Sequence, residues 1–285
     1  MTIKSGYIAI IGKPNVGKST LMNYLLGKKI SIVSRKPQTT RHRILGIKTT
    51  DTTQMVFVDT PGLHGNQTRE ANRVMNRVAR MALFEVDIIL FLIEPLRWDA
   101  DDDLVLQQLK RIEKPVILVI NKIDTVKHKE ILLPFMENLA KQFMFEKIIP
   151  IAAKTGLQVG ELESIIEKLL PQEGNLFPPE QWTDRSNQFI ASEFVREPLM
   201  KLLGDEIPYE LSVVTETFTE EKKLIRICAV IYVPKPSQKS IVIGKGGSVL
   251  KKVGTEARFN LEAYFEKKVF LKLWVKVGAV RVETR

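Results

Sequence analysis

Short, nearly continuous hydrophobic segments alternate with amphipathic, helix-like stretches over the first 170 residues. A strand that is apolar along its whole length is covered on both faces, as in parallel sheets whose crossover helices pack on either side. The pattern therefore predicts a doubly wound, mostly parallel α/β sheet. The hydrophobic segments are residues 7–11, 55–58, 88–93, 116–120 and 148–151.

The pattern changes after Pro171. Residues 171–186 are rich in proline and polar side chains, which is the composition of an interdomain linker. We therefore predict a first domain over residues 1–170 and a second, α+β domain over residues 187–285. The elements expected in the second domain are a helix over 187–203 interrupted at Glu197-Pro198, strands over 209–218 and 224–233, a helix after the glycines at 244–247, and an alternating strand over 269–277.

The net charge of +10 is unevenly distributed along the chain. Residues 1–50 hold ten Lys or Arg and no acid, and residues 235–285 hold twelve against four, so the chain between them is acidic. Basic blocks of this kind attract nucleic acid or anionic lipid without choosing between them. A merely solvated basic surface is the third interpretation.

The single cysteine, Cys228, excludes an internal disulfide and fits a reducing cytosol. Its place in a strand-like segment favours a buried structural thiol. No hydrophobic run approaches the roughly 20 residues needed to span a bilayer. We therefore expect a soluble, cytoplasmic protein.

Residues 12–19 read Gly-Lys-Pro-Asn-Val-Gly-Lys-Ser, directly after the first hydrophobic segment and before a helix-like stretch. This is the phosphate-loop pattern in its required context. Glycines let backbone amides turn onto phosphates, and the helix N-terminus adds a positive end. We expect Lys18 at the β- and γ-phosphates and Ser19 as a Mg²⁺ ligand. The predicted nucleotide contacts here are Gly12, Lys13, Pro14, Asn15, Val16, Gly17, Lys18, Ser19 and Thr20.

The base that is bound is predicted from residues 121–124, Asn-Lys-Ile-Asp, which directly follow a buried strand. They should therefore lie at the ligand-binding edge of the sheet. A carboxylate at Asp124 can accept both the N1 and N2 hydrogens of guanine, whereas adenine offers no such pair of donors. We predict Asn121, Lys122 and Asp124 as the guanine-binding residues. A solvated turn with an aspartate helix cap and a phosphate-loop kinase or ATPase are the alternatives.

A third motif, Asp59-Thr60-Pro61-Gly62, follows another hydrophobic segment. It places Asp59 where a carboxylate faces Mg²⁺ and the Gly62 amide where it can sense a γ-phosphate. Leu63 completes this part of the predicted nucleotide site. Between the first and third motifs, an irregular polar stretch suited to ordering around the metal contains Thr40, our predicted third Mg²⁺ ligand, with Thr39 as the alternative.

The second domain contains a candidate RNA-binding loop, Ile243-Gly244-Lys245-Gly246-Gly247, ahead of a helix. Glycines allow a sugar-phosphate backbone to approach, and lysines supply charge. GxxG alone also describes an ordinary glycine turn, but the order helix, two strands, helix, GxxG, helix, strand resembles a type II KH fold. The predicted RNA-binding residues are Ile243, Gly244, Lys245, Gly246, Gly247, Lys251 and Lys252.

The order of these motifs and the residues within them resemble those of the translation-factor-related GTPases, and among these the Era family, over nearly the whole chain. The resemblance implies GTP hydrolysis with Mg²⁺, and binding to the 3′ end of 16S ribosomal RNA during assembly of the 30S subunit. We expect a monomer. Family members are sometimes described as peripherally membrane-associated, so a regulatory GTPase at the inner face of the membrane is the alternative function.

The resemblance also adds a loop that closes on the base, matched here by Ala152, Ala153 and Lys154. The family usually has serine at position 152, so one side-chain contact is lost. The Ala153 amide can still donate to the guanine carbonyl.

Hydrolysis is expected to depend on groups near the γ-phosphate, and we predict Lys18, Thr40, Gly62 and Asn15 as the catalytic set. Leu63 stands where Ras-like enzymes have the glutamine that orients water. In relatives with asparagine at the position of Asn15 and a hydrophobic residue after the glycine, K⁺ supplies the missing positive charge. K⁺ is therefore a candidate activator, with carbonyls of residues 31–36 completing its shell. The alternative is that Asn15 only shapes the turn.

Overall fold

The computed structural model describes residues 3–37, 39–60, 83–204 and 207–278. The chain forms two compact units. The first comprises residues 1–31 and 37–184, and the second comprises residues 32–36 and 185–285. Of the described helices, none is both long and apolar enough to cross a membrane.

The first unit is built on a six-stranded sheet with the strand order β2-β3-β1-β4-β5-β6. All neighbouring strands are parallel except β2, which runs antiparallel to β3. The strands are β1 (Lys4–Ile11), β2 (Ile44–Thr49), β3 (Thr53–Asp59), β4 (Ile88–Ile93), β5 (Val116–Ile120) and β6 (Lys147–Pro150). The predicted mostly parallel α/β sheet is thus confirmed, and β2 is the strand that the hydrophobic pattern missed.

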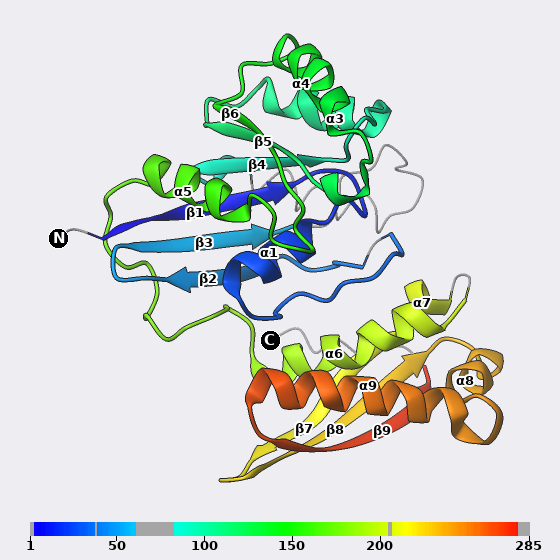
Figure 1. Ribbon diagram of the computed structural model, residues 1–285. Helices are drawn as coiled ribbons and strands as arrows, with labels where there is room; N and C mark the ends of the chain where they lie inside the picture. The colour runs from blue at the N-terminus through cyan, green and yellow to red at the C-terminus, as the bar shows by residue number, and fades with distance from the viewer. Residues whose placement is uncertain (1–2, 38, 61–82, 205–206, 279–285) are drawn as a thin grey trace. The chain divides into compact units, whose positions relative to one another are not determined.

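Helices cover both faces of this sheet (Figure 1). Helices α3 and α4 contribute Leu109 and Leu139 to the core on one face, where Ile89 and Phe91 of β4 also lie. On the other face, α1 and α5 lie in front of the strands in Figure 1. The helices are α1 (Lys18–Leu26), α3 (Ala100–Leu109), α4 (Leu132–Ala140) and α5 (Val159–Leu169), with short 3-10 turns at Ile123–Thr125 (η1) and Lys129–Ile131 (η2).

The predicted linker packs against the first unit along most of its length. The amides of Leu176 and Phe177 donate to the buried Gln54 side chain at 2.7 and 2.8 Å. Thr183 pairs with Gly46 of β2. Extended backbone can pair with an exposed strand edge. The linker therefore packs against the first unit even though its composition is rich in proline.

The second unit has three strands in the order β7-β8-β9, with β7 antiparallel and β9 parallel to the central β8. Helices α6, α8 and α9 send Leu199, Val242 and Val253 into one core on the same side of this sheet. The elements are α6 (Asn187–Leu202), α7 (Ile207–Glu210), β7 (Ser212–Glu220), β8 (Leu224–Val233), α8 (Pro236–Ile243), a 3-10 turn η3 (Lys245–Gly247), α9 (Ser248–Phe265) and β9 (Lys268–Val277).

Helix α6 differs from the prediction because it continues through Pro198 rather than breaking there. A proline inside a helix removes one backbone hydrogen bond. Val195 and Leu199, on either side of it, are fully buried in the core, and this packing holds the helix together.

Candidate functional site

The predicted phosphate loop lies between β1 and α1, and its backbone takes the turn that a phosphate cradle needs. Asn15 and Gly17 have φ angles of 64° and 101°. A Cβ atom at Gly17 would lie 2.3 Å from the Asn121 Nδ2 atom, so only glycine fits between the loop and that side chain. Thr20 is half-buried in the first turn of α1.

Lys18 is buried with its ammonium group held inside the loop. Its Nζ donates to the carbonyl of Gly12 at 2.9 Å and to that of Lys13 at 2.8 Å. Burial lowers the pKa of Lys18 to about 8, although the charge of Asp59 opposes this shift. A phosphate beside this ammonium would favour its charged form, so the position suits a phosphate-binding lysine.

The three predicted Mg²⁺ ligands meet beside the loop. Ser19 Oγ lies 2.8 Å from Asp59 Oδ2 and 3.1 Å from Thr40 Oγ1. Burial raises the pKa of Asp59, while hydrogen bonds from Ser31 and Ser19 act against it. The Asp59 Oδ1 atom is buried without a hydrogen-bond partner among the described residues. An unpaired carboxylate oxygen beside two hydroxyls fits a hard divalent cation such as Mg²⁺.

Ser31 is a member of this cluster that the motifs did not indicate. Its hydroxyl donates to Asp59 Oδ2 at 2.7 Å. Its carbonyl, which we expected in a K⁺ shell, accepts from Asn23 Nδ2 at 2.7 Å. The hydroxyl of Thr60 donates to the Ile10 carbonyl at 3.1 Å and so ties the third motif to β1. Pro61, Gly62 and Leu63 lie outside the described residues.

Asn121 joins the phosphate loop to the loop after β6. Its Nδ2 donates to the Val16 carbonyl at 2.8 Å, and its Oδ1 accepts from the Ala153 amide at 2.9 Å. The Ala153 amide, which we expected to face guanine, is thus used inside the protein. A guanine carbonyl would have to share it or bind the next amide, at Lys154. Ala152 and Ala153 are buried, and Lys154 is exposed.

The exposed Asp124 is presented by a tight turn. Lys122 takes a left-handed conformation with φ 66°, and the Thr125 amide closes the turn on the Lys122 carbonyl at 3.0 Å. The Ile123 amide anchors it to Ile151 at 3.2 Å. This places the carboxylate at the carboxyl edge of the sheet, as the motif predicts.

Lys13 departs from the prediction because its side chain is directed to helix α3. Its buried Nζ lies 2.8 Å from Asp99 Oδ2 and 2.7 Å from Asp102 Oδ2. Burial alone would lower the pKa of Lys13, but the hydrogen bonds to these carboxylates outweigh it and raise the pKa. Only the backbone of Lys13, whose carbonyl accepts from Lys18, takes part in the phosphate loop.

The two carboxylates belong to a chain of charges that reaches the guanine motif. Arg97 bridges Asp99 and Glu94, at 3.5 Å in each case. Glu94 in turn accepts from Lys122 Nζ at 2.5 Å. This series of ion pairs connects the phosphate loop to residue 122 through the segment after β4. The sequence offered only a weak signal for these ion pairs, namely the helix-capping pattern formed by Asp99 and Asp102 at the start of α3.

Asn121→Ala tests the junction of the loops. Two buried groups, the Val16 carbonyl and the Ala153 amide, would lose their partner, and each unsatisfied group costs about 1–3 kcal/mol. We expect GTP affinity to fall by about tenfold to a hundredfold, with a lower free energy of unfolding in urea. Gln107→Ala removes an exposed amide from α3 and should change neither quantity. Wild-type affinity and stability in Asn121→Ala would mean that the loops do not depend on this side chain.

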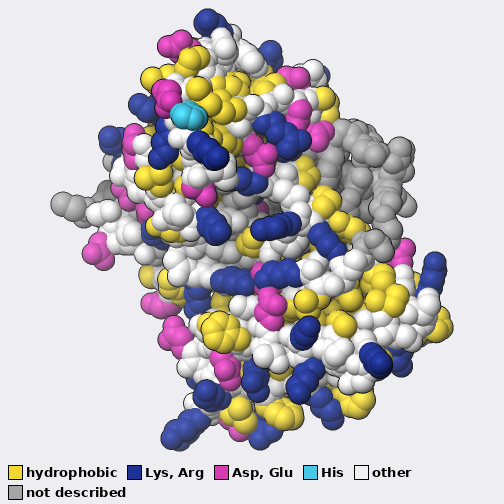
Figure 2. Space-filling model, turned by 45° about the vertical axis from the view of Figure 1, so that its right-hand side comes forward, with side chains coloured by type: hydrophobic (Ala, Val, Ile, Leu, Met, Phe, Trp, Pro, Cys, Tyr) yellow, Lys and Arg dark blue, Asp and Glu magenta, His cyan; other side chains and the backbone are white. Residues whose placement is uncertain are grey.

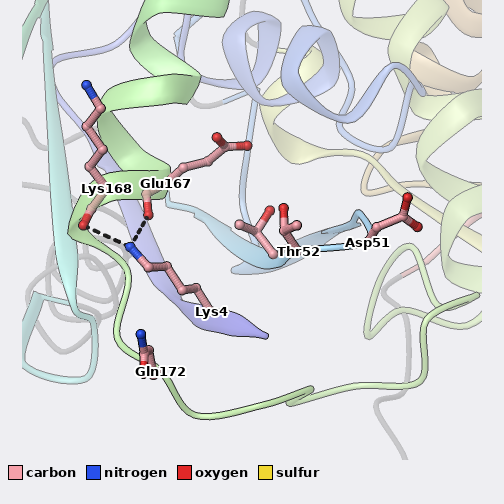
Figure 3. A pocket seen from close by; sticks show the side chains of 7 residues that line it. Lys4, Asp51, Thr52, Glu167, Lys168 and Gln172 are labelled. Carbon is pink, nitrogen blue, oxygen red and sulfur yellow. Dashed lines mark hydrogen bonds between the residues drawn. The ribbon is translucent and has the colours of Figure 1, made fainter. Parts of the chain in front are cut away.

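A separate polar pocket lies at the opposite edge of the sheet, around the start of β1 (Figure 3). Lys4 Nζ donates there to the carbonyls of Glu167 and Lys168 at 3.2 and 3.4 Å. These carbonyls are in the last turn of α5, where a cation stabilises the helix end. The length of β1, roughly 25 Å, separates this pocket from the phosphate loop. We interpret it as structural.

The candidate RNA loop lies between α8 and α9. Gly246 has a φ angle of 59°, and a Cβ atom there would meet nothing within 4 Å. Lys245 and Gly246 are exposed, while Ile243, Gly244 and Gly247 are half-buried. Lys251 and Lys252 are exposed near the start of α9. The loop therefore presents open backbone and positive charge together.

Comparison with known proteins decides the family. Residues 7–122 match a family described as 50S ribosome-binding GTPase, and residues 206–280 match the KH domain family. GTPase Era of Coxiella burnetii (strain Dugway 5J108-111) is 60% identical over 272 residues, which are 95% of this chain and 92% of the relative. This chain belongs to the Era family of GTPases. GTPase Era of Haemophilus influenzae (strain PittGG) is 50% identical over 95% of this chain and 90% of its own length.

The structural similarity to Era extends over both units. A crystal structure of Era in complex with MgGDPNP and nucleotides 1506–1542 of 16S ribosomal RNA matches with a TM-score of 0.91 at 39% identity, covering 97% of this chain and 94% of that chain. The predicted family and fold class, a phosphate-loop GTPase domain followed by a KH domain, are confirmed.

Proposed function

We propose that this Era-family GTPase binds GTP with Mg²⁺ at the carboxyl edge of its six-stranded sheet, and that its KH unit binds the 3′ end of 16S ribosomal RNA during 30S subunit assembly. The observation that carries the nucleotide site is the convergence of four separate sequence motifs. The Ser19 hydroxyl links the phosphate loop to Asp59. The Asn121 side-chain amide links the Val16 carbonyl of the same loop to the Ala153 amide. The Era complex with MgGDPNP and 16S RNA supports both ligands.

In the proposed site, Lys18 and the amides of the phosphate loop bind the β- and γ-phosphates. Ser19, Thr40 and Asp59 hold Mg²⁺, which neutralises charge on those phosphates when bound. Ion pairing of Lys13 with Asp99 and Asp102 holds the loop against α3, since Lys13 and Asp102 are both buried and separating them would leave two buried charges unpaired. Asp124 selects guanine, and Asn121 keeps the guanine loops in register with the phosphate loop.

K⁺ is the activator that we propose for hydrolysis. The support is that Lys13 is paired with two carboxylates, which leaves Lys18 as the described phosphate-loop lysine that can place positive charge on the phosphates. Additional positive charge at the γ-phosphate must therefore be brought to the site. Asn15, exposed at the mouth of the loop, is the side chain proposed to help hold it.

We propose that the RNA backbone passes over Gly246, with Lys245, Lys251 and Lys252 contributing charge. Type II KH domains clamp about four nucleotides beside such a loop. Gly246→Asp places a bulky negative group in this path and should weaken RNA binding while leaving GTP affinity unchanged. Gly174→Asp, at another glycine with a positive φ and open space around it, is the matched control. Unchanged RNA affinity at fixed salt in Gly246→Asp would reduce the loop to a simple turn.

For the whole protein we propose a monomer in the cytoplasm. Peripheral association with the inner face of the membrane is the second candidate, supported by the basic blocks at residues 1–50 and 235–285. Comparing how much protein is pulled down by anionic liposomes and by RNA distinguishes the cytoplasmic protein from the membrane-associated one. Preference for liposomes would favour the membrane-surface GTPase.

A further inference from the structure

The sheet of the second unit has one face that the described helices leave uncovered. On β8 and β9 one set of alternating side chains, including Ala229, Ile231 and Val275, packs into the core under α6, α8 and α9. The other set points away from these helices, and we call its surface the open sheet face. Its members on the two strands are Leu224, Arg226, Cys228, Val230, Tyr232, Lys268, Phe270, Lys272, Trp274 and Lys276.

Two large aromatic side chains stand on this face with a cation over each ring. Phe270 is 53% exposed and Trp274 is 51% exposed. Arg226 lies 5.7 Å from the centroid of the Phe270 ring, and the Lys272 ammonium lies 4.9 Å from that of Trp274. Four residues along a strand separate the two rings by roughly 13 Å. Neither aromatic position was among the residues predicted to bind RNA.

Charge on the open sheet face is predominantly positive. Lys272 and Lys276 alternate with the aromatic residues on β9, and Arg226 is on the adjacent β8. Acids partly offset them, because Glu216 accepts from Lys276 at 3.0 Å and Glu221 from Arg226 at 2.9 Å. On the side of the molecule drawn in Figure 2, Lys and Arg side chains are interspersed with hydrophobic ones.

We propose that the open sheet face is a second RNA-binding surface. When RNA binds, Arg226 and Lys272 move from the two rings to the adjacent phosphates, and unpaired bases stack against Phe270 and Trp274 in their place. This inference rests on the proposed function, since it extends the RNA contact beyond the glycine loop. Base–aromatic stacking tolerates any base and is worth about 1–3 kcal/mol per base. The face therefore adds affinity for a longer RNA strand, and the glycine-loop groove reads its sequence.

The composition of the face favours RNA over a protein partner or a lipid surface. Protein interfaces are depleted of lysine at their centres, whereas Lys272 lies between the two aromatic side chains. An interfacial membrane contact buries a broad apolar face, whereas here every second exposed position on β9 is a lysine. Aromatic rings alternating with cations are the combination that single-stranded nucleic acid uses.

Cys228 provides a test without any substitution. It is the only cysteine of the chain, it is half-buried rather than fully buried as its strand suggested, and it pairs with Lys272 across the open sheet face. Alkylation of Cys228 by iodoacetamide in the full-length protein should be slowed severalfold by RNA of nucleotides 1506–1542. A four-nucleotide RNA that fills only the groove should not slow it. Equal alkylation rates with and without the long RNA, under conditions where it is bound, would overturn the proposal.

Affinity measurements on variants provide the second test. Trp274→Ala should weaken binding of the long RNA by about fivefold to a hundredfold, the equivalent of one stacked base, and Trp274→Phe should restore most of the loss. Lys272→Gln should lower the salt dependence of binding by about one unit in a log-log plot. Trp182→Ala is the matched control, because Lys28 lies 5.2 Å from the centroid of that exposed ring in the first unit.

The outcomes separate this inference from the proposed function. If the wild-type protein fails to bind RNA, or Gly246→Asp binds it normally, the proposed function is at fault. If Gly246→Asp lowers RNA affinity while Trp274→Ala and Lys272→Gln match wild type, the open sheet face is not an RNA surface. Loss of binding to anionic vesicles in Trp274→Ala, with RNA affinity unchanged, would assign the face to lipid and overturn the proposal.

Discussion

Asp124→Asn is expected to reduce GTP affinity by about 10²- to 10⁴-fold. The carboxylate would accept two hydrogen bonds from guanine, and hydrogen bonds to a charged group contribute about 1.5–3 kcal/mol each. The amide retains one acceptor but places a donor against the second guanine hydrogen. Xanthine carries a carbonyl in place of the exocyclic amine, so the same amide can pair with it. The variant should therefore bind xanthosine triphosphate better than GTP in direct nucleotide titrations.

Asp51→Asn is the matched control for this variant. Asp51 is an exposed aspartate at the opposite edge of the sheet, so its replacement makes the same change in net charge without touching the guanine turn. Undiminished preference for GTP in Asp124→Asn would remove Asp124 from the specificity role. Equal binding of ATP and GTP by the wild-type protein would contradict the selection of guanine by this turn.

The sheet and the nucleotide motifs could be predicted because both are local in sequence. Five of the six strands of the first unit coincide with hydrophobic segments, and phosphate, base and metal motifs each follow the end of a strand. Strand β2 was missed because Gly46 and polar residues weaken its pattern, and its position depends on pairing with β3.

Interactions between distant segments could not be predicted in the same way. Lys13 and Asp102 are 89 positions apart, and the acidic run after Trp98 offers several aspartates of which only the fold selects two. Ser31 lies 28 positions from Asp59 in a stretch with no motif. The same limit applies to the linker, since nothing in its prolines indicates that Gln54 binds the amides of Leu176 and Phe177.

The open sheet face shows a different limit. Alternation along 269–277 predicted a half-exposed strand with a basic side, and β9 has that pattern. The partners across the sheet were not predictable, because the parallel pairing that sets Arg226 beside Phe270 depends on the crossover through α8 and α9.

GTP hydrolysis is expected to be faster in K⁺ than in Na⁺ at equal ionic strength. An added positive charge at the transferring phosphate is worth about 10³ to 10⁵ in rate when an arginine supplies it, which sets the upper limit for K⁺ here. Leu63 has no group that could orient water. Lys13, the nearest additional cation in the loop sequence, is paired with two carboxylates, so the protein's own described loop side chains do not meet this need.

Asn15 is the residue on which this difference in rate should depend. Its left-handed backbone, with φ 64°, belongs to the turn, and its side chain, on an exposed residue, is the one that we propose joins a phosphate oxygen in holding the ion. Asn15→Ala and Asn15→Asp should hydrolyse GTP at equal rates in the two salts. Gln107→Ala should keep the difference, because it removes an exposed amide remote from the loop. The Asn15 variants should still bind GDP if the ion acts mainly on the transition state, since charge that develops there is absent from the product. Equal rates in K⁺ and Na⁺ for the wild-type protein would exclude the ion as activator and leave bound RNA or a protein partner as the source of the missing charge.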